Sequence, residues 1–189
     1  MEYMGDESYW NHKFKNRIEE LLQPEELLLK DIEYFQFGDF GLELACGDGR
    51  NIIPLAQRGY VMMGVDFSEI AIGRLKHFSE EQAVKVETFQ MDLSKRFFLD
   101  RLPKFDFIII NHYRLCPDFY LGLMEHLNEG GFLWVNGFRT LPINNSDIME
   151  KDLLRNKDFE QIQNLLLDKK EYENGDRKFV RYCFRKRLS

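Results

Sequence analysis

The stretch Phe40–Asn51 reads FGLELACGDGRN, a short apolar strand that runs into a turn containing Gly47 and Gly49. Glycine lets the backbone bend sharply and approach a ligand closely, and Glu43 places a carboxylate near the end of the strand. A strand, a glycine turn and a helix in this order often cradle a nucleotide. We therefore expect a nucleoside-like ligand at this turn.

Two features of the turn separate the possible ligand classes. A dinucleotide site has a third glycine three residues after the second, but that position here is Ile52. Glu43 and Asp48 would repel a pyrophosphate, whereas they would tolerate a ligand that carries an ammonium and a sulfonium. The GRN ending also lacks the Lys-Ser/Thr pair of a phosphate-binding P-loop. These residues favour S-adenosylmethionine.

The segment Leu42–Asp66 (LELACGDGRNIIPLAQRGYVMMGVD) resembles the first two motifs of class I S-adenosylmethionine-dependent methyltransferases. Its CGDGRN and RGY signatures are similar to those of the tellurite-resistance-like small-molecule group. Ala45 departs from the glycine that the broad family usually has at this position, but its small side chain should still let the ligand approach. The resemblance extends over residues 40–140 and implies that S-adenosyl-L-methionine is the cofactor.

Composition limits the possible classes of protein. The chain has 189 residues, 44% of them apolar and 31% charged, which predicts one domain with a sizeable core. We expect a helical cap over residues 1–36 and a Rossmann-like core over 37–189. The acidic start and the absence of a long apolar run predict a cytoplasmic protein with no membrane partner. The cysteines and histidines are too widely spaced to predict a disulfide framework or a metal site.

Periodicity and turn residues predict the elements. The expected strands are 60–65, 84–91, 105–110 and 132–136. The expected helices are 17–22, 24–35, 52–56, one that begins at Ser68, 117–127 and 146–163. Gly130-Gly131 is expected to close the helix over 117–127. The run 105–110 is apolar on nearly every residue, which is typical of a central strand. Asn174-Gly175 between two strand-like runs predicts a hairpin. We expect an α/β, doubly wound, mostly parallel seven-stranded sheet with helices on both faces and a C-terminal antiparallel hairpin.

The resemblance also implies the cofactor-binding residues. Asp66 would accept hydrogen bonds from the ribose hydroxyls, Phe67 would pack on adenine, and Asn111 would lie under the sulfur. The full expected set is Glu43, Ala45, Cys46, Gly47, Gly49, Asn51, Asp66, Phe67, Ser68, Met91, Asp92, Leu93 and Asn111. Asp66 could instead simply cap a helix, and Cys46 is interpreted as a small turn residue rather than a nucleophile.

The sequence is less specific about the residues that would bind the methyl acceptor. His112 and Tyr113 follow the central strand and are candidate catalytic residues that would remove a proton from a hydroxyl or amine, although a lone histidine is often structural. Arg139 could hold an anionic acceptor or be a solvated loop residue. Tyr9 and Trp10 would belong either to a flap over the cofactor mouth or to an aromatic anchor on the outer sheet.

Net charge bears on the partner. A net charge of −6 argues against broad nucleic-acid affinity and favours a small-molecule methyl acceptor. The terminal hairpin is basic, and we interpret its charges as a solvated outer face: Arg177, Lys178, Arg181, Arg185, Lys186 and Arg187. An RNA or DNA methyltransferase that uses this hairpin is an alternative, as is a regulatory protein that binds the cofactor without turnover. The sequence indicates no oligomeric state.

Overall fold

The computed structural model describes residues 6–32, 38–142 and 148–188. The strands are β1 (Phe40–Leu44), β2 (Val61–Asp66), β3 (Val86–Gln90), β4 (Phe105–Asn111), β5 (Leu127–Phe138), β6 (Leu166–Asn174) and β7 (Arg177–Arg185). The α-helices are α1 (Glu7–Lys15), α2 (Glu26–Asp31), α3 (Ile52–Gln57), α4 (Glu69–Glu81) and α5 (Tyr120–Glu125). Short 3₁₀ helices are η2 (Arg96–Arg101), η3 (Pro117–Phe119), η4 (Glu150–Asp152) and η5 (Asn156–Leu165).

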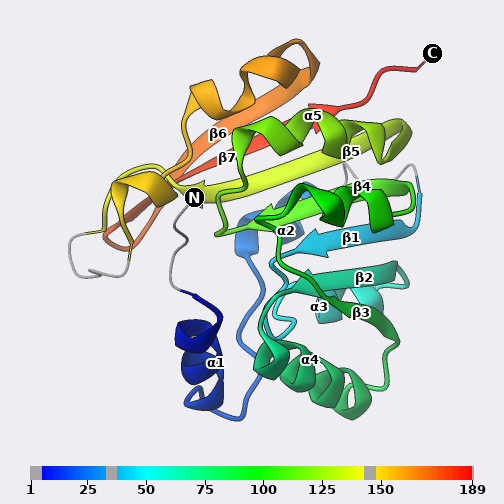
Figure 1. The fold of residues 1–189 in the computed structure, drawn as a ribbon, viewed down its shortest axis with the longest axis vertical. Coiled ribbons are helices and arrows are strands. Elements are labelled where there is room, and N and C mark those ends of the chain that lie inside the picture. Colours follow the sequence, from blue (N-terminus) through cyan, green and yellow to red (C-terminus); the bar gives the residue numbers. More distant parts are fainter. Residues whose placement is uncertain (1–5, 33–37, 143–147, 189) are drawn as a thin grey trace.

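The strands form one seven-stranded sheet in the order β3-β2-β1-β4-β5-β7-β6, as Figure 1 shows. The pairs from β3 to β5 are parallel, and β7 is antiparallel to both β5 and β6. The predicted fold class is therefore confirmed, including the central position of β4 and the terminal hairpin. The strand order reverses between β1 and β4, and in such sheets ligands bind beyond the carboxyl ends of the strands at this point.

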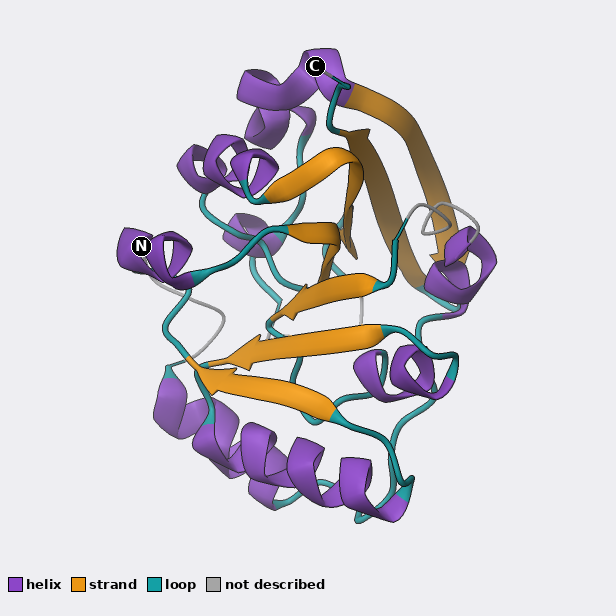
Figure 2. Ribbon diagram, turned by 90° about the vertical axis from the view of Figure 1, so that its right-hand side faces the viewer, coloured by secondary structure: helices purple, strands orange, loops and turns teal. Residues whose placement is uncertain are grey.

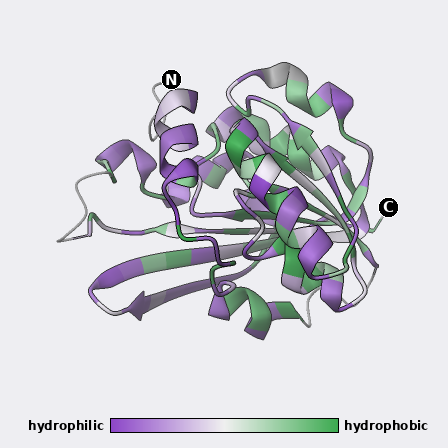
Figure 3. Cartoon of the chain, turned by 90° about the horizontal axis from the view of Figure 1, so that it is seen from below, coloured by the Kyte–Doolittle hydropathy of each residue, from purple (hydrophilic) through white to green (hydrophobic). Residues whose placement is uncertain are grey.

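Helices cover both faces of the sheet (Figure 2). Alternate residues of each strand point to opposite faces, so Leu42 and Ile108 belong to one hydrophobic cluster while Phe107 and Ile109 belong to the other. The first cluster is closed by α5 and the 3₁₀ helices, and the second by α2, α3 and α4. Hydropathy colouring in Figure 3 agrees, with apolar residues gathered along the inner strands. In the described ranges, no helix combines the length and apolar character needed to cross a bilayer.

The region before β1 differs from the prediction. No helix forms over 17–22; α1 lies earlier and begins after Asp6, whose side chain accepts a 2.8 Å hydrogen bond from the Tyr9 backbone N–H. Arg17 pairs with Asp48, and the Ile18 carbonyl accepts a 2.7 Å bond from Arg74. The Ile18 carbonyl is a group that a helix over 17–22 would have used for its own hydrogen bonds. The second helix, expected over 24–35, begins two residues later than predicted, as α2, and residues 33–37 lie outside the described residues.

Two predictions about the C-terminal half are wrong. The glycines at 130 and 131 do not close α5 but lie inside β5, where Lys186 pairs with both of them and extends the strand. The single helix predicted over 146–163 is replaced, in its described part, by η4 and η5. Residues 153–155 between them are extended because Leu154 donates a 2.9 Å hydrogen bond to the carbonyl of Phe138. Ser146 lies outside the described residues.

Arg181 corrects the interpretation of the basic hairpin. Its side chain is 2% exposed, with Nε 2.7 Å from Asp31 and Nη1 2.6 Å from Asp168. Asp31 also accepts a 3.0 Å hydrogen bond from the indole of Trp134, which lies on β5. Arg181 is therefore not part of a solvated face but joins α2 to the sheet. Replacing Arg181 should leave the buried charge of Asp31 without a counter-charge.

We expect Arg181→Met to lower the free energy of unfolding by about 3–5 kcal/mol, because Asp31 would remain buried without its cation. Arg177→Met is the matched control, since Arg177 is exposed on the same strand. It should change stability by less than about 0.5 kcal/mol. Urea unfolding at pH 7 measures both, and equal small changes would contradict the buried role of Arg181.

Candidate cofactor and acceptor site

A cavity opens beyond the carboxyl ends of β1, β2 and β4. Its volume is about 200 Å³, and about 970 Å³ when the open space at its mouth is counted. The residues that line it are Trp10, Phe14, Arg17, Glu43, Ala45, Cys46, Gly47, Asp48, Arg50, Asn51, Asp66, Phe67, Asp92, Leu93, Asn111, His112 and Tyr113. Most of the residues predicted from the sequence therefore come together in one place.

The turn after β1 has an unusual backbone. Gly47 and Gly49 have φ angles of 56° and 97°, and a Cβ at Gly49 would lie 2.4 Å from Leu75. Both positions therefore need glycine. Ala45 also has a positive φ, 54°, which costs a residue with a Cβ some strain. The alanine that replaces the family's usual glycine thus occupies a conformation that suits glycine better.

Glu43 is buried at the base of the turn, with 2% of its surface exposed. Its Oε1 accepts a 2.8 Å hydrogen bond from Asn51, while its buried Oε2 has no hydrogen-bond partner. Burial raises the pKa of Glu43 to about 8, against the lowering effects of Asn51 and Arg50. The carboxyl is therefore largely protonated at neutral pH, and an incoming cation would ionise it.

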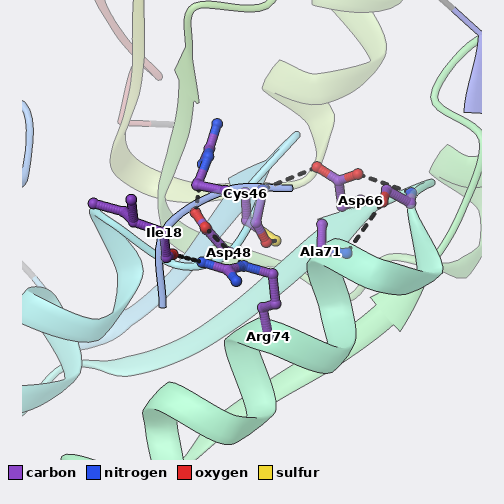
Figure 4. A network of polar contacts seen from close by, with 9 residues as sticks. Ile18, Cys46, Asp48, Asp66, Ala71 and Arg74 are labelled. Carbon is purple, nitrogen blue, oxygen red and sulfur yellow. Dashed lines mark hydrogen bonds and ion pairs between the residues drawn. The ribbon is translucent and has the colours of Figure 1, made fainter. Parts of the chain in front are cut away.

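Asp48 is paired with two arginines. Arg17 lies 2.9 Å from its Oδ1 and Arg74 3.2 Å from its Oδ2. Figure 4 shows Arg74 reaching from α4 to both Asp48 and the carbonyl of Ile18. The acids at the turn thus carry less free negative charge than the sequence suggests. Repulsion of a pyrophosphate is weaker as a result, although the third glycine of a dinucleotide site is still absent, with Ile52 in its place.

Asp66 joins the first two turns of the sheet. Its Oδ2 accepts a 2.9 Å hydrogen bond from the Gly47 backbone and its Oδ1 a 2.9 Å bond from the Ser68 backbone, as drawn in Figure 4. Asp66 therefore does not cap α4 itself, since the cap is Ser68, and a ribose would have to use the remaining lone pairs of Asp66. Burial raises the pKa of Asp66. Burial, followed by the charges of Asp66 and Glu43, raises the pKa of the Cys46 thiol, which makes it a poor nucleophile.

The expected adenine side is partly assembled. Phe67, Asp92 and Leu93 line the cavity, and Asp92 also accepts a 2.9 Å hydrogen bond from the Ser94 backbone. Ser68 caps α4 by accepting from Ala71, as predicted, but it lies outside the cavity lining. Met91 is likewise absent from the lining residues.

The side of the cavity that was expected to hold the acceptor is built around His112, which follows β4 and has a φ of 55°. Its ring stacks on Phe179 at 5.1 Å and lies 5.4 Å from Phe138. Its Nε2 is 3.3 Å from Glu25, at the start of α2. Tyr113 lines the cavity beside it, and the Asn111 side chain accepts a 2.9 Å hydrogen bond from Asn136. His112 is thus held in a strained and crowded position.

The N-terminal helix α1 contributes Trp10 and Phe14 to the cavity lining. Asn11 fixes it to α4 through a 2.6 Å hydrogen bond from the Ser68 hydroxyl. The helix thus packs on α4 and the glycine turn. Tyr9 lies edge-on against Trp10 but does not line the cavity.

Arg139 lies apart from the site. It is 3.0 Å from Glu171 and lines a separate depression. Sequence reasoning also missed Arg17, Arg50 and Glu25, which lie in or against the cavity. Arg50 was within the quoted motif, but nothing in the local pattern marks Glu25. In the described part of the chain, no group of three or more His, Cys, Asp or Glu residues is arranged to hold a metal ion.

Arg74→Met should loosen α1, because it removes the contacts that tie α4 to Asp48 and to the chain just after α1. Loss of about 1.4 kcal/mol would speed amide hydrogen exchange in residues 7–18 about tenfold. Lys76→Met, exposed on the same helix, should leave exchange unchanged. Equal exchange in all three proteins, measured by mass spectrometry, would show that α1 is held by its apolar contacts alone.

Comparison with known proteins agrees with this geometry. A family model described as a methyltransferase domain matches residues 42–131. A probable S-adenosyl-L-methionine-dependent methyltransferase, TehB of Haemophilus influenzae, is 29% identical over 98 residues, which are 48% of this chain and 33% of TehB. The match thus spans about a third of the length of the curated relative.

Solved structures share the fold. The structure of TehB from Haemophilus influenzae superposes with a TM-score of 0.70 at 20% identity, covering 96% of this chain and 67% of that one. A protein from a study of the conversion of a disulfide bond into a thioacetal group during echinomycin biosynthesis gives a TM-score of 0.74 at 13% identity, covering 95% and 91% of the two chains. Residues 42–131 match a methyltransferase domain, and the chain resembles the class I S-adenosylmethionine-dependent methyltransferases, TehB among them.

Proposed function

We propose that this chain is an S-adenosylmethionine-dependent methyltransferase that acts on a small-molecule acceptor. The observation that carries the proposal is the buried Oε2 of Glu43, which has no hydrogen-bond partner among the described residues. A buried carboxylate oxygen without a partner is costly, and a ligand ammonium would satisfy it. S-adenosylmethionine carries such an ammonium and supplies an activated methyl group on its sulfonium.

The rest of the cavity supports the same ligand. Gly47 leaves room for the methionine half, Asp66 offers carboxylate lone pairs to a ribose, and Phe67 offers an apolar surface to adenine, whereas Gly49 does not line the cavity. Residues 1–36 would form the cap and residues 37–189 the catalytic core of one domain.

A small acceptor is supported by charge and by the relatives. The chain has a net charge of −6, and Arg181 is buried, so the hairpin offers less free positive charge to a nucleic acid than its sequence suggests. The echinomycin structure concerns a small molecule. His112 and Tyr113 on the cavity wall are suited to taking a proton from an acceptor, which favours an enzyme over a regulatory protein without turnover.

Calorimetry with S-adenosylmethionine, S-adenosylhomocysteine and NAD tests the cofactor. We expect the first two to bind and NAD to fail, because Ile52 fills the position where a dinucleotide site has glycine. A panel of metabolites assayed for release of S-adenosylhomocysteine then tests turnover. Tight NAD binding without a response to S-adenosylhomocysteine would reject the proposed cofactor, and activity only on RNA or DNA would reject the small acceptor.

Glu43 predicts a proton linked to binding. Since burial raises its pKa to about 8, it is protonated at pH 7, and a bound ammonium would ionise it. Binding at pH 7 should therefore release about one proton, and affinity should rise with pH until about pH 8. Calorimetry of S-adenosylhomocysteine in two buffers with different ionisation enthalpies measures this release. Glu43→Gln, which cannot ionise, should bind more weakly without releasing a proton; unchanged proton release in this variant would assign the proton to another group.

A further inference from the structure

Glu25 is a buried acid outside the motif region that contacts the acceptor side of the cavity. It is 6% exposed and lies just before α2. Its Oε2 is 3.3 Å from both His112 Nε2 and Arg50 Nη2, and its Oε1 is 3.1 Å from the Tyr172 hydroxyl. These partners come from the end of β4, the glycine turn and β6. Glu25 therefore joins three parts of the fold at one carboxylate.

The surroundings keep this carboxylate charged. Burial alone would raise the pKa of Glu25, but the hydrogen bond and charge of His112, together with Arg50 and Tyr172, outweigh burial and hold the pKa below its ordinary value. An ionised carboxylate accepts hydrogen bonds and donates none. His112 Nε2 is buried, lies 3.3 Å from this carboxylate and has no partner of hydrogen-bond geometry among the described residues. The nearby negative charge favours the ring proton on Nε2, which leaves Nδ1 with a lone pair.

The ring of His112 has little freedom to leave this position. It lies parallel to Phe179 within 11°, and its own backbone N–H donates a 2.8 Å hydrogen bond to the Asn136 carbonyl. The positive φ of His112 is a strained conformation that the surrounding contacts must maintain. Strain of this kind is commonly found at functional sites, and His112 lines the cavity.

Glu25 also connects the two halves of the site. Its backbone N–H donates a 2.8 Å hydrogen bond to Asn51, whose amide in turn donates to Glu43. The same short segment thus positions the carboxyl group proposed to meet the cofactor ammonium and the imidazole proposed to meet the acceptor.

We propose that Glu25 is a positioning residue for methyl transfer, which holds His112 with its proton on Nε2 so that Nδ1 accepts the proton that the acceptor loses. The inference rests on the proposed function and narrows its substrate class to acceptors with an O–H, N–H or S–H bond. A lone pair of the acceptor atom forms the bond to the methyl carbon, and the carbon–sulfur bond breaks with its electron pair remaining on sulfur. The acceptor proton passes to Nδ1, and the imidazolium that results faces the Glu25 carboxylate.

Glu25→Gln keeps the size of the side chain and removes its charge. We expect kcat to fall at least about tenfold, because the imidazolium loses its counter-charge. Affinity for S-adenosylhomocysteine, measured by calorimetry, should stay within about threefold of the wild type. Nitrogen-15 NMR of His112 should show a larger share of the tautomer protonated on Nδ1, a readout that needs no turnover.

Tyr172→Phe is the matched control. It removes the hydroxyl that contacts Glu25 but keeps the carboxylate and the ring packed 5.3 Å from Phe179. It should leave kcat within about threefold and the His112 tautomer unchanged. Equal losses of kcat in both variants, together with an unchanged tautomer, would mean that Glu25 only fastens the N-terminal segment to the hairpin, and would overturn the proposal.

The two proposals fail in different ways. A wild-type protein that releases no S-adenosylhomocysteine with any acceptor would reject the methyltransferase function. An unchanged His112 tautomer in Glu25→Gln would reject the positioning role, whether or not turnover is found.

Discussion

The hydrogen bonds that Asp66 accepts from the Gly47 and Ser68 backbones are the constraint on which the site depends. They join the turn after β1 to the start of α4, so that the two turns at the switch point move as one unit. The glycine turn has positive φ angles at three positions and would be costly to hold without such support. Asp48, clamped by Arg17 and Arg74, fixes the outer side of the same turn. The cavity floor is therefore rigid before any ligand arrives.

Much of the fold could be predicted because its signals are local. The continuous apolar run of β4, the capping Ser68 and the Asn174-Gly175 turn each depend on a few neighbouring residues, and the structure has all three as expected. Recognising the glycine turn also predicted most of the residues that line the cavity. Helix predictions failed where backbone groups form tertiary hydrogen bonds, as the carbonyl of Ile18 and the N–H of Leu154 do.

The residues that sequence reasoning missed have distant partners. Arg181 was interpreted as exposed because its neighbours alternate along a strand, but its buried partner Asp31 lies 150 positions earlier. Glu25 resembles any acid at a helix start until Tyr172, 147 positions later, is placed beside it. Charge states were also beyond the sequence: Glu43 and Asp48 look alike as acids, yet burial leaves one largely neutral while two arginines compensate the other.

The large separation between Glu25 and Tyr172 has a consequence for the order of folding. The glycine turn and α4 lie within one continuous stretch of chain and can form by local closure, whereas His112 needs Phe179 from β7 and Glu25 needs the N-terminal segment docked against β6. Contacts between distant segments form slowly because of the entropy of loop closure. The wall of the cavity that contains His112 should therefore be completed only once both ends of the chain have docked, after the local contacts of the glycine turn have formed.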